Sequence, residues 1–577
     1  MIDLNKLEQK LRIALLGGGP SALFMFKKLL ESGQTDIAVT IFEKGKQLGS
    51  GMPYSKIGAN PEHITNVSGN EIPELITSVE QWIETAPKNV LDQFDITLQK
   101  YNDYKVLPRL LFGHYLTEQF RLLCERADRA GLEYLISYES EVTDIVDKPD
   151  RSTTIVEINN GEQIPFDKVV VCIGHTWAKK HEGKISGYFD SPYPPSKLAM
   201  KLDHPVAIRG ASLTAIDAVR TFARSNGKFI ESADGKLSYQ IDPDSANFKM
   251  VMHARSGLLP AVRFHLKDPH LSADDTLTKE DMQNYSSEHG GLLSLDHLFE
   301  ENFKAGIRKN DPEFYERIRG MNMEEFVTEM MEVREQVDPF NLFEAEYMEA
   351  EKSIQRRESV YWKEMLAILS YSLNYPAKYL PAEDMQRLKK TLMPLISIVI
   401  AFVPQSSCEQ LLALHKAGLL EMVSVGDDSF VEPNEAGGAL YHYTDDDGKQ
   451  QIKHYQTYVD CVGQPHMSYT DVPFKGLLDG RSISPARVRF KSNSIGKEQQ
   501  DGGNEDVQQG SDGNYYLNVP GIAINDNFQV LDSYGAYNPR IYMMAVPYIG
   551  GFNPDYSGLD FCDTASDAII KTILNDD

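Results

Sequence analysis

The hydrophobic period changes twice in the first 45 residues of the chain. Ile13 to Leu16 form a continuous apolar run, which predicts a buried strand, and a segment of helical spacing precedes a second β-rich run from Ile37 to Phe42. Gly17 to Ala22 lie between the first run and the helix in the pattern G-x-G-x-x-A, and the second run closes on Glu43. This order of strand, glycine turn, helix, strand and acid predicts a dinucleotide-binding βαβ unit.

Each position of this turn has a physical reason. Gly17 permits the tight turn out of the strand, Gly19 lets the backbone approach a pyrophosphate, and Ala22 allows close packing of the helix on the strand. The helix N-terminus offers free N–H groups to the phosphates, and Glu43 is placed to accept the hydroxyls of an adenosine ribose. The residues expected to contact the cofactor in this unit are Gly17, Gly19, Pro20, Ser21, Ala22, Glu43 and Lys44.

The next part of the chain alternates loops, helices and short strands. Gly49 to Ile72 is rich in turn formers, so we expect an irregular, functional loop beside the nucleotide turn. Helices are predicted over Ser78 to Thr85 and over Arg109 to Gly131. Short apolar runs are typical of a β-meander that returns to a parallel sheet: Leu132–Ile136, Ser140–Val146, Thr153–Ile158 and Lys168–Cys172. Gly174 follows the last run, where it would let the backbone approach a cofactor at the sheet edge.

A second nucleotide turn is predicted in Val206 to Gly227. A strand leads into Gly210-x-Ser212-x-x-Ala215 and an amphipathic helix, with Ser212 in place of the second glycine. The following strand, Lys249 to Gly257, carries Arg255 near its end rather than an acid, and arginine suits a 2′-phosphate. The pattern predicts an NADPH site, although an α/β unit without a ligand is the alternative.

The spacing of apolar residues changes in the second half of the chain. From Asp274 to about Gly418 the apolar residues recur at helical spacing, which predicts an inserted helical domain. Leu420 to Asp460 is β-rich again, and the C-terminal segment predicts a strand, a Gly/Pro loop and a closing helix. Ile495 to Asn514 is polar and low in complexity, so a mobile loop or hairpin tip is expected there.

Composition narrows the class of protein. A length of 577 residues allows three or four structural units, and a net charge of −26 argues against nucleic acid or an anionic membrane as partner. The N-terminal residues lack the apolar core of a signal peptide, and the longest apolar run, Leu392 to Val403, is too short to cross a bilayer. A cytoplasmic enzyme is therefore expected. The five cysteines form no close pair, which argues against a disulfide scaffold, a zinc site or a disulfide reductase.

Several motifs together resemble the FAD-NAD(P)-binding family of bacterial flavoproteins, which is distantly similar to flavin-dependent N-hydroxylating monooxygenases. These motifs are GGGPSA, GSGMPYS, HITNVSG, LPRLLFGHYL, CIGHTW, GASLTAID and HARSGLLP. The resemblance implies that FAD is contacted by Gly17, Gly19, Ala22, Glu43, Gly51, Tyr54, Asn66 and Arg109, with Val142 at the adenine and Gly174 near the flavin. It implies that the nicotinamide cofactor is contacted by Gly210, Ser212, Thr214 and Arg255. The His-containing fingerprint of Baeyer–Villiger enzymes is absent from the segment between the two units, which disfavours that reaction.

The expected fold class is α/β, with two Rossmann-like dinucleotide-binding domains, three-layer and built on parallel sheets, and an inserted helical domain. The expected FAD-binding domain comprises 1–190 and 471–577. The expected NAD(P)-binding domain comprises 191–273 and 419–470, and the helical insert is 274–418.

Three functions remain open at this point. The first is an NADPH-dependent FAD monooxygenase that hydroxylates a small amine or amino acid with molecular oxygen through a C4a-(hydro)peroxyflavin. The second is a flavin reductase or dehydrogenase that passes electrons to an organic acceptor, and the third is a non-catalytic FAD- or nucleotide-binding protein. No catalytic acid or base is assigned, because His63, His175 and Asp555 lie in loops that could border the flavin but each suits a structural role better. The substrate and the oligomeric state also stay open.

Overall fold

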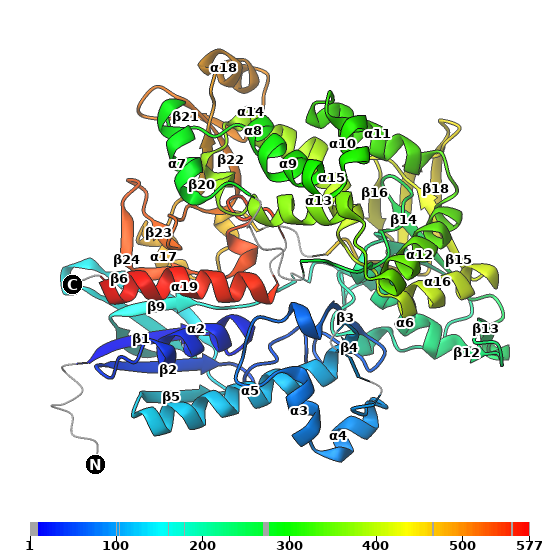
Figure 1. Cartoon of the computed structure of the whole chain (residues 1–577), viewed down its shortest axis with the longest axis horizontal. Coiled ribbons are helices and arrows are strands. Elements are labelled where there is room, and N and C mark those ends of the chain that lie inside the picture. The colour runs from blue at the N-terminus through cyan, green and yellow to red at the C-terminus, as the bar shows by residue number, and fades with distance from the viewer. Residues whose placement is uncertain are drawn as a thin grey trace.

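Two parallel sheets and a group of helices account for most of the chain (Figure 1). The computed structural model describes residues 10–99, 101–102, 104–159, 161–177, 179–268, 276–463, 467–555 and 558–575.

The first sheet has the strand order β23-β24-β9-β1-β2-β5. Only β23 runs antiparallel to its neighbour, and every other pair is parallel. The strands are β1 (Leu11–Leu16), β2 (Ile37–Glu43), β5 (Glu133–Tyr138), β9 (Lys168–Val171), β23 (Gln529–Leu531) and β24 (Tyr537–Met543). The central strands β1 and β9 end in fully buried apolar runs, as expected of strands covered on both faces.

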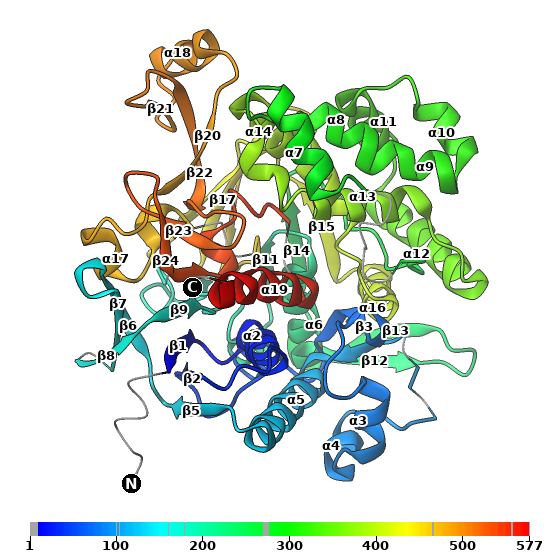
Figure 2. The same cartoon turned by 60° about the vertical axis from the view of Figure 1, so that its left-hand side comes forward.

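Helices cover one face of this sheet and a small antiparallel sheet covers the other. Figure 2 shows α2 (Pro20–Glu31), α5 (Arg109–Ala130) and α19 (Leu559–Asn575) in one column beside the strands. The opposite face holds β6 (Val142–Lys148), β7 (Thr153–Ile158) and β8 (Glu162–Phe166), which pair in that order. The expectation that Leu132–Ile136 belongs to the meander is wrong. That segment forms β5, because the long helix α5 returns the chain to the sheet edge in a parallel crossover beside β2.

The second sheet has the order β10-β19-β11-β14-β15 and is parallel throughout. Its strands are β10 (Tyr188–Phe189), β11 (Pro205–Arg209), β14 (Lys249–Ala254), β15 (Leu420–Ser424) and β19 (Thr457–Asp460). Helices α6 (Leu213–Asn226) and α16 (Gln405–Lys416) contribute to its core. A three-stranded antiparallel sheet packs on it through aromatic side chains: β16 (Phe430–Pro433), β17 (Ala439–Thr444) and β18 (Gln450–Tyr455).

Apart from α16, which lies beside the second sheet, the helices between β14 and β15 form much of the upper half of the molecule in Figure 1. They are α7 (Lys279–Glu288), α8 (Leu295–Phe299), α9 (Ala305–Asn310), α10 (Pro312–Ile318), α11 (Met323–Glu335), α12 (Pro339–Arg356), α13 (Tyr361–Ser372), α14 (Ala382–Arg387) and α15 (Met393–Val399). Helix α13 is buried along most of its length and crosses the middle of the molecule. Residues 279–399 are largely helical, as expected of the helical insert, while its expected bounds, 274 and 418, stay predictions, and Asp274 lies outside the described residues.

Shorter elements complete the fold. They are β3 (Ile64–Ser68), β4 (Val106–Pro108), α3 (Val79–Thr85), α4 (Lys88–Gln93), β12 (Gly227–Glu231), β13 (Leu237–Ile241), α17 (Lys475–Asp479), β20 (Pro485–Arg489), α18 (Asn493–Asp501), β21 (Val507–Gln509) and β22 (Tyr515–Ile522). The mobile loop expected at Ile495–Asn514 is wrong over most of its length, because α18 extends to Asp501 and β21 follows it, whereas residues 510–514 form the tip of the β21–β22 hairpin. Gly496 gives α18 room against Tyr515 and Phe490, and Gln499 pairs with Gln386 of the helical domain.

The fold class expected from the sequence is confirmed: two α/β units with parallel sheets and an inserted helical domain. None of the described helices is long and apolar enough to cross a membrane.

Candidate functional site

The first glycine turn lies where β1, β2 and β9 end together. Gly17 has a φ of +102°, and its N–H donates to the Phe42 carbonyl at 2.8 Å. A Cβ at Gly17 would lie 2.9 Å from the carbonyl oxygen of Cys172. Only glycine therefore fits both the backbone angle and the space.

Glu43 is held at the same turn by backbone donors. Gly18 N donates to its Oε2 at 2.8 Å, and Gly45 N donates to its Oε1 at 2.6 Å. These two bonds fix the carboxylate at the end of β2, while its remaining lone pairs can accept ribose hydroxyls. Lys44 follows with an exposed side chain.

Helix α2 presents an open N-terminus to this turn. Gly19 is its N-cap residue, no side chain caps it, and no acidic residue stands in its first turn. A Cβ at Gly19 would lie 3.4 Å from the Cα of Gly51, so two glycines leave space beside the uncapped N–H groups. Pro20 opens the helix, and Ser21 Oγ lies 3.5 Å from Cys562 Sγ of α19. Ala22 is fully buried against the sheet.

The second turn repeats the first. Gly210 has a φ of +109°, its N–H donates to the His253 carbonyl at 2.8 Å, and its Cβ would lie 2.9 Å from the carbonyl oxygen of Cys461. Ser212 takes the N-cap place of Gly19 with the same extended backbone, φ −83° and ψ −171° against −82° and −163°. Its side chain makes no capping bond, and the first turn of α6 also lacks an acidic residue.

Arg255 follows β14 at the carboxyl edge of the second sheet. Its side chain is 73% exposed, and its Nη1 lies 3.5 Å from Oδ1 of Asp427, which is 89% exposed. Such an exposed pair is weak, so Arg255 can exchange Asp427 for a phosphate.

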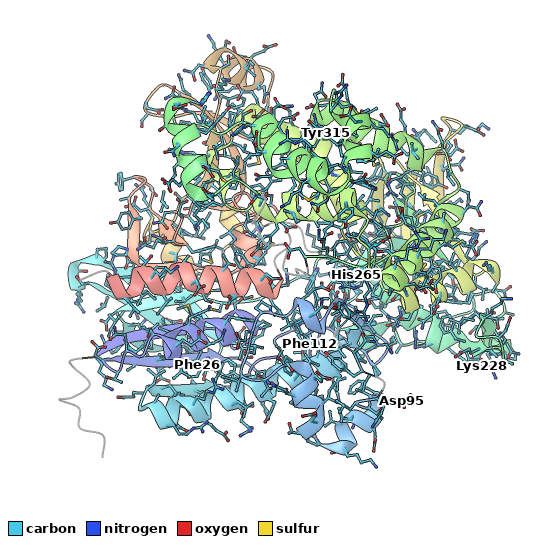
Figure 3. All side chains as sticks on the ribbon, in the orientation of Figure 1. Phe26, Asp95, Phe112, Lys228, His265 and Tyr315 are labelled. Carbon is cyan, nitrogen blue, oxygen red and sulfur yellow. The ribbon has the colours of Figure 1, made fainter. Side chains whose placement is uncertain are left out.

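The remaining residues expected at FAD differ in how far they are exposed to solvent. Tyr54 is packed edge-on against Phe112 of α5 at 4.9 Å, and burial raises the pKa of its hydroxyl to about 12. Asn66 lies on β3 with an exposed side chain, Val142 opens β6, and Gly174 is exposed after β9. Figure 3 shows Phe112 near the middle of the molecule, whereas Phe26 lies farther out in the first unit.

Arg109 and Thr214, expected at different cofactors, lie in one partly buried cluster between the two units, in which Asp217 is the buried member. Arg109 Nη1 lies 2.7 Å from Asp217 Oδ2 on α6, and its Nε donates to the Ile64 carbonyl at 3.0 Å. The Tyr193 hydroxyl lies beside both Arg109 and Thr214, close enough for each to influence its ionisation. Burial, with the Asp217 carboxylate second, raises the pKa of Tyr193 to about 12. We define Arg109, Tyr193, Thr214 and Asp217 as the interdomain cluster.

Sequence reasoning missed Tyr193 and Asp217. The sequence offers one signal for Asp217, since a carboxylate stands there among the small and apolar residues of GASLTAID. It offers none for Tyr193. Nothing local identifies the partner of Asp217, since Arg109 lies in another unit.

The three loop residues considered as flavin neighbours have structural partners. His63 is buried, its Nε2 lies 3.0 Å from Thr221 Oγ1, and burial lowers its pKa. His175 lies beside Trp177, with ring centroids 5.9 Å apart. Asp555 Oδ1 accepts from Ser370 Oγ of α13 at 2.9 Å.

These residues fit the two expected cofactors. The close backbone approaches at Gly17 and Gly210, the uncapped starts of α2 and α6, and the fixed Glu43 carboxylate match a pyrophosphate and a ribose. Within the described part of the chain no group of three or more His, Cys, Asp or Glu side chains could hold a metal ion.

Comparisons with known proteins agree with the two expected cofactors. Residues 14–176 match the family described as FAD-NAD(P)-binding, and residues 278–400 match the family described as YdhS-like middle domain. The chain is 27% identical over 478 residues to the uncharacterized protein YdhS of Escherichia coli K12, a match covering 81% of this chain and 86% of that protein. The resemblance to the FAD-NAD(P)-binding family is thus confirmed over residues 14–176, and its description agrees with the expected FAD and nicotinamide cofactors.

Two solved structures are similar in fold. The ornithine N-hydroxylase of Kutzneria sp. 744 shares 12% identity and a TM-score of 0.48, with 98% of this chain and 99% of that chain covered. The cadaverine monooxygenase DfoA of Erwinia amylovora, bound to FAD, shares 11% identity and a TM-score of 0.47, with 97% and 94% covered.

Proposed function

We propose that this protein is an FAD-dependent oxidoreductase that uses NADPH and acts as a monooxygenase on a small amine or amino acid. The observation that carries the proposal is the repeated glycine turn. Gly17 and Gly210 have nearly equal positive φ angles, 102° and 109°. At either position, an added Cβ would lie only 2.9 Å from the carbonyl oxygen of a neighbouring strand end. One chain therefore offers two dinucleotide sites.

The two sites differ in the charged group at the carboxyl end of the second strand of each unit. Glu43 offers a carboxylate, which suits the free ribose hydroxyls of FAD, while Arg255 offers a cation, which suits the 2′-phosphate of NADPH. The isoalloxazine ring of bound FAD supplies the redox chemistry, and the protein supplies binding, orientation and exclusion of water.

The helical domain supports a monooxygenase over a plain reductase. It is joined to the loop before α19 by Ser370 Oγ, which donates to Asp555 at 2.9 Å, and by Asn374 Oδ1, which accepts from Asp555 N at 3.0 Å. Cys562 of α19 in turn lies 3.5 Å from Ser21 at the start of α2, so we infer that α13, held to the loop before α19, helps to cover the region beside the FAD turn. A covered site keeps water from a reactive oxygen species, which a reductase does not require.

Three measurements on the purified protein test the proposal. Denaturation should release FAD rather than FMN, anaerobic NADPH should bleach the flavin faster than NADH, and oxygen uptake should yield hydroxylated product with a member of an amine and amino acid panel. Rapid turnover on quinones or dyes without oxygenated product would assign the reductase instead. Bound FAD that neither nucleotide reduces would assign the non-catalytic binding protein.

A further inference from the structure

The segment of residues 49–72, which carries Gly51, Tyr54 and Asn66, is attached to the second unit at two places. The first is α6, where Thr221 Oγ1 donates to Glu62 Oε1 at 2.7 Å and lies 3.0 Å from His63 Nε2.

The second attachment follows β14. Arg263 is buried, its Nη2 lies 2.9 Å from Ser68 Oγ and pairs with Glu71, and its Nη1 donates to the Asn66 carbonyl. Burial lowers the pKa of Arg263 to about 10. The expected FAD loop therefore rests on a helix and a segment that belong to the expected NADPH site.

Helix α6 connects the two sites directly. It begins at Leu213, beside Ser212 and Thr214 of the second turn, and carries Asp217 and Thr221 within its next turns. Asp217 is buried and pairs with Arg109, the first residue of α5. Because a helix moves as a rigid rod over this length, any shift of its phosphate-binding end displaces the partners of Arg109 and Glu62.

We propose that the Arg109–Asp217 pair and the Thr221 contacts couple the two cofactor sites, so that NADP⁺ bound at the start of α6 raises the affinity for FAD. This inference rests on the proposed function. Asp217 and Thr221 are positioning residues, since they act through Arg109, Glu62 and His63. Coupling of this kind is reciprocal and typically changes affinity about 5- to 150-fold.

The test measures FAD release from the holoprotein by the rise of flavin fluorescence after dilution, with and without saturating NADP⁺. In the wild type NADP⁺ should slow release at least about fivefold. In Asp217→Asn the ratio of the two rates should fall toward one, and Asp217→Glu should restore part of it. Thr221→Val replaces the hydroxyl with a methyl group of nearly the same shape and leaves the Arg109–Asp217 pair in place. It should also lower the ratio, so the test stays valid if Asp217→Asn folds poorly.

Asp167→Asn is the matched control, because the Arg12–Asp167 pair at 3.3 Å lies within the first unit alone. Its ratio should equal that of the wild type. A wild-type ratio of one, or an unchanged ratio in both Asp217→Asn and Thr221→Val, would overturn the coupling while leaving FAD binding and NADPH reduction intact. A wild-type protein without FAD would instead refute the proposed function.

Discussion

Gly19 gives a direct test of the FAD turn. Its backbone angles are open to any residue, but a valine side chain would project into the space between Gly19 and Gly51, whose Cα lies 3.4 Å from the added Cβ. We expect Gly19→Val to lose most of its FAD, about a tenfold to hundredfold weakening if phosphate contacts worth about 1.5–3 kcal/mol are lost. Flavin content per chain, measured by absorbance, checks this.

Gly320→Ala serves as control, because no atom lies within 4 Å of the added Cβ. Full FAD occupancy in Gly19→Val would show that the pyrophosphate lies elsewhere.

Arg255 should distinguish NADPH from NADH. Its exposed contact with Asp427 is easily exchanged, so a 2′-phosphate should bind there with a charge-assisted bond worth about 1.5–3 kcal/mol. NADPH should therefore reduce the flavin with a kcat/KM about ten- to a hundredfold above that of NADH, and Arg255→Ala should remove most of that preference. Asp427→Asn should retain it. Equal rates with both nucleotides in the wild type would contradict the assignment.

Residues with a local reason could be predicted from the sequence, and residues with a distant partner could not. Gly17 and Gly210 are required by the turn in which they stand, so spacing alone identifies them. Asp217 and Tyr193 matter through Arg109, and no pattern in one sequence relates positions in separate units. The functions of Glu43 and Arg255 toward ribose and phosphate stay predictions.

At the scale of elements, strand β14 carries a buried ionisable side chain. His253 lies under the β16–β18 sheet, stacked on Tyr441 at 4.1 Å, with its Nε2 3.3 Å from Tyr455 OH. Burial lowers its pKa from 6.5 to about 4. Above pH 6.5 His253 is neutral in both the folded and the unfolded chain, and the fold has its full stability. As pH falls from 6.5 through 4, the unfolded chain binds a proton at this side chain before the folded chain does, so the free energy of unfolding decreases.

The expected loss is about 3 kcal/mol between these two pH values. Urea unfolding at pH 7 and pH 4.5 should show a smaller decrease in stability for His253→Phe than for the wild type, because phenylalanine keeps the ring stacking but has no proton to gain. Equal decreases in both proteins would exclude His253 as the cause.

Helices and strands with a clear hydrophobic period were predicted from the sequence, whereas short or polar ones were missed. The glycine after α5 and the serine before α3 act as caps where the sequence placed the helix ends. Helix α18 was missed because it is polar and holds a glycine, and contacts with the helical domain, such as Gln499 with Gln386, stabilise it instead. β8 was missed because it is short and partly exposed.

At the scale of the whole molecule, the sequence indicated the units but not how they pack. The helical domain reaches the first unit through Asp526, in the turn before β23. Its carboxylate accepts from Lys378 Nζ at 2.7 Å, from Tyr379 OH at 2.9 Å and from Tyr375 OH at 3.2 Å. All three donors come from the short segment after α13, so one carboxylate anchors this segment of the helical domain to the first unit.

Removal of this anchor should loosen the cover without changing either nucleotide turn. We expect Asp526→Ala to keep NADPH-driven flavin reduction within about twofold of the wild type, while the fraction of consumed oxygen released as hydrogen peroxide rises severalfold, because water then reaches the reduced flavin site. A peroxide assay during NADPH oxidation with saturating amine measures that fraction, and thermal unfolding run in parallel detects a general loss of stability.

Asp296→Ala is the matched control. Asp296 pairs with Arg387 at 2.6 Å entirely within the helical domain, so its loss removes a carboxylate of the same domain surface but no contact with the first unit. The peroxide fraction should stay at the wild-type value in this control. If Asp526→Ala also leaves it unchanged, the helical domain does not exclude water from the flavin, and the fold then gives no reason to prefer a monooxygenase to a reductase.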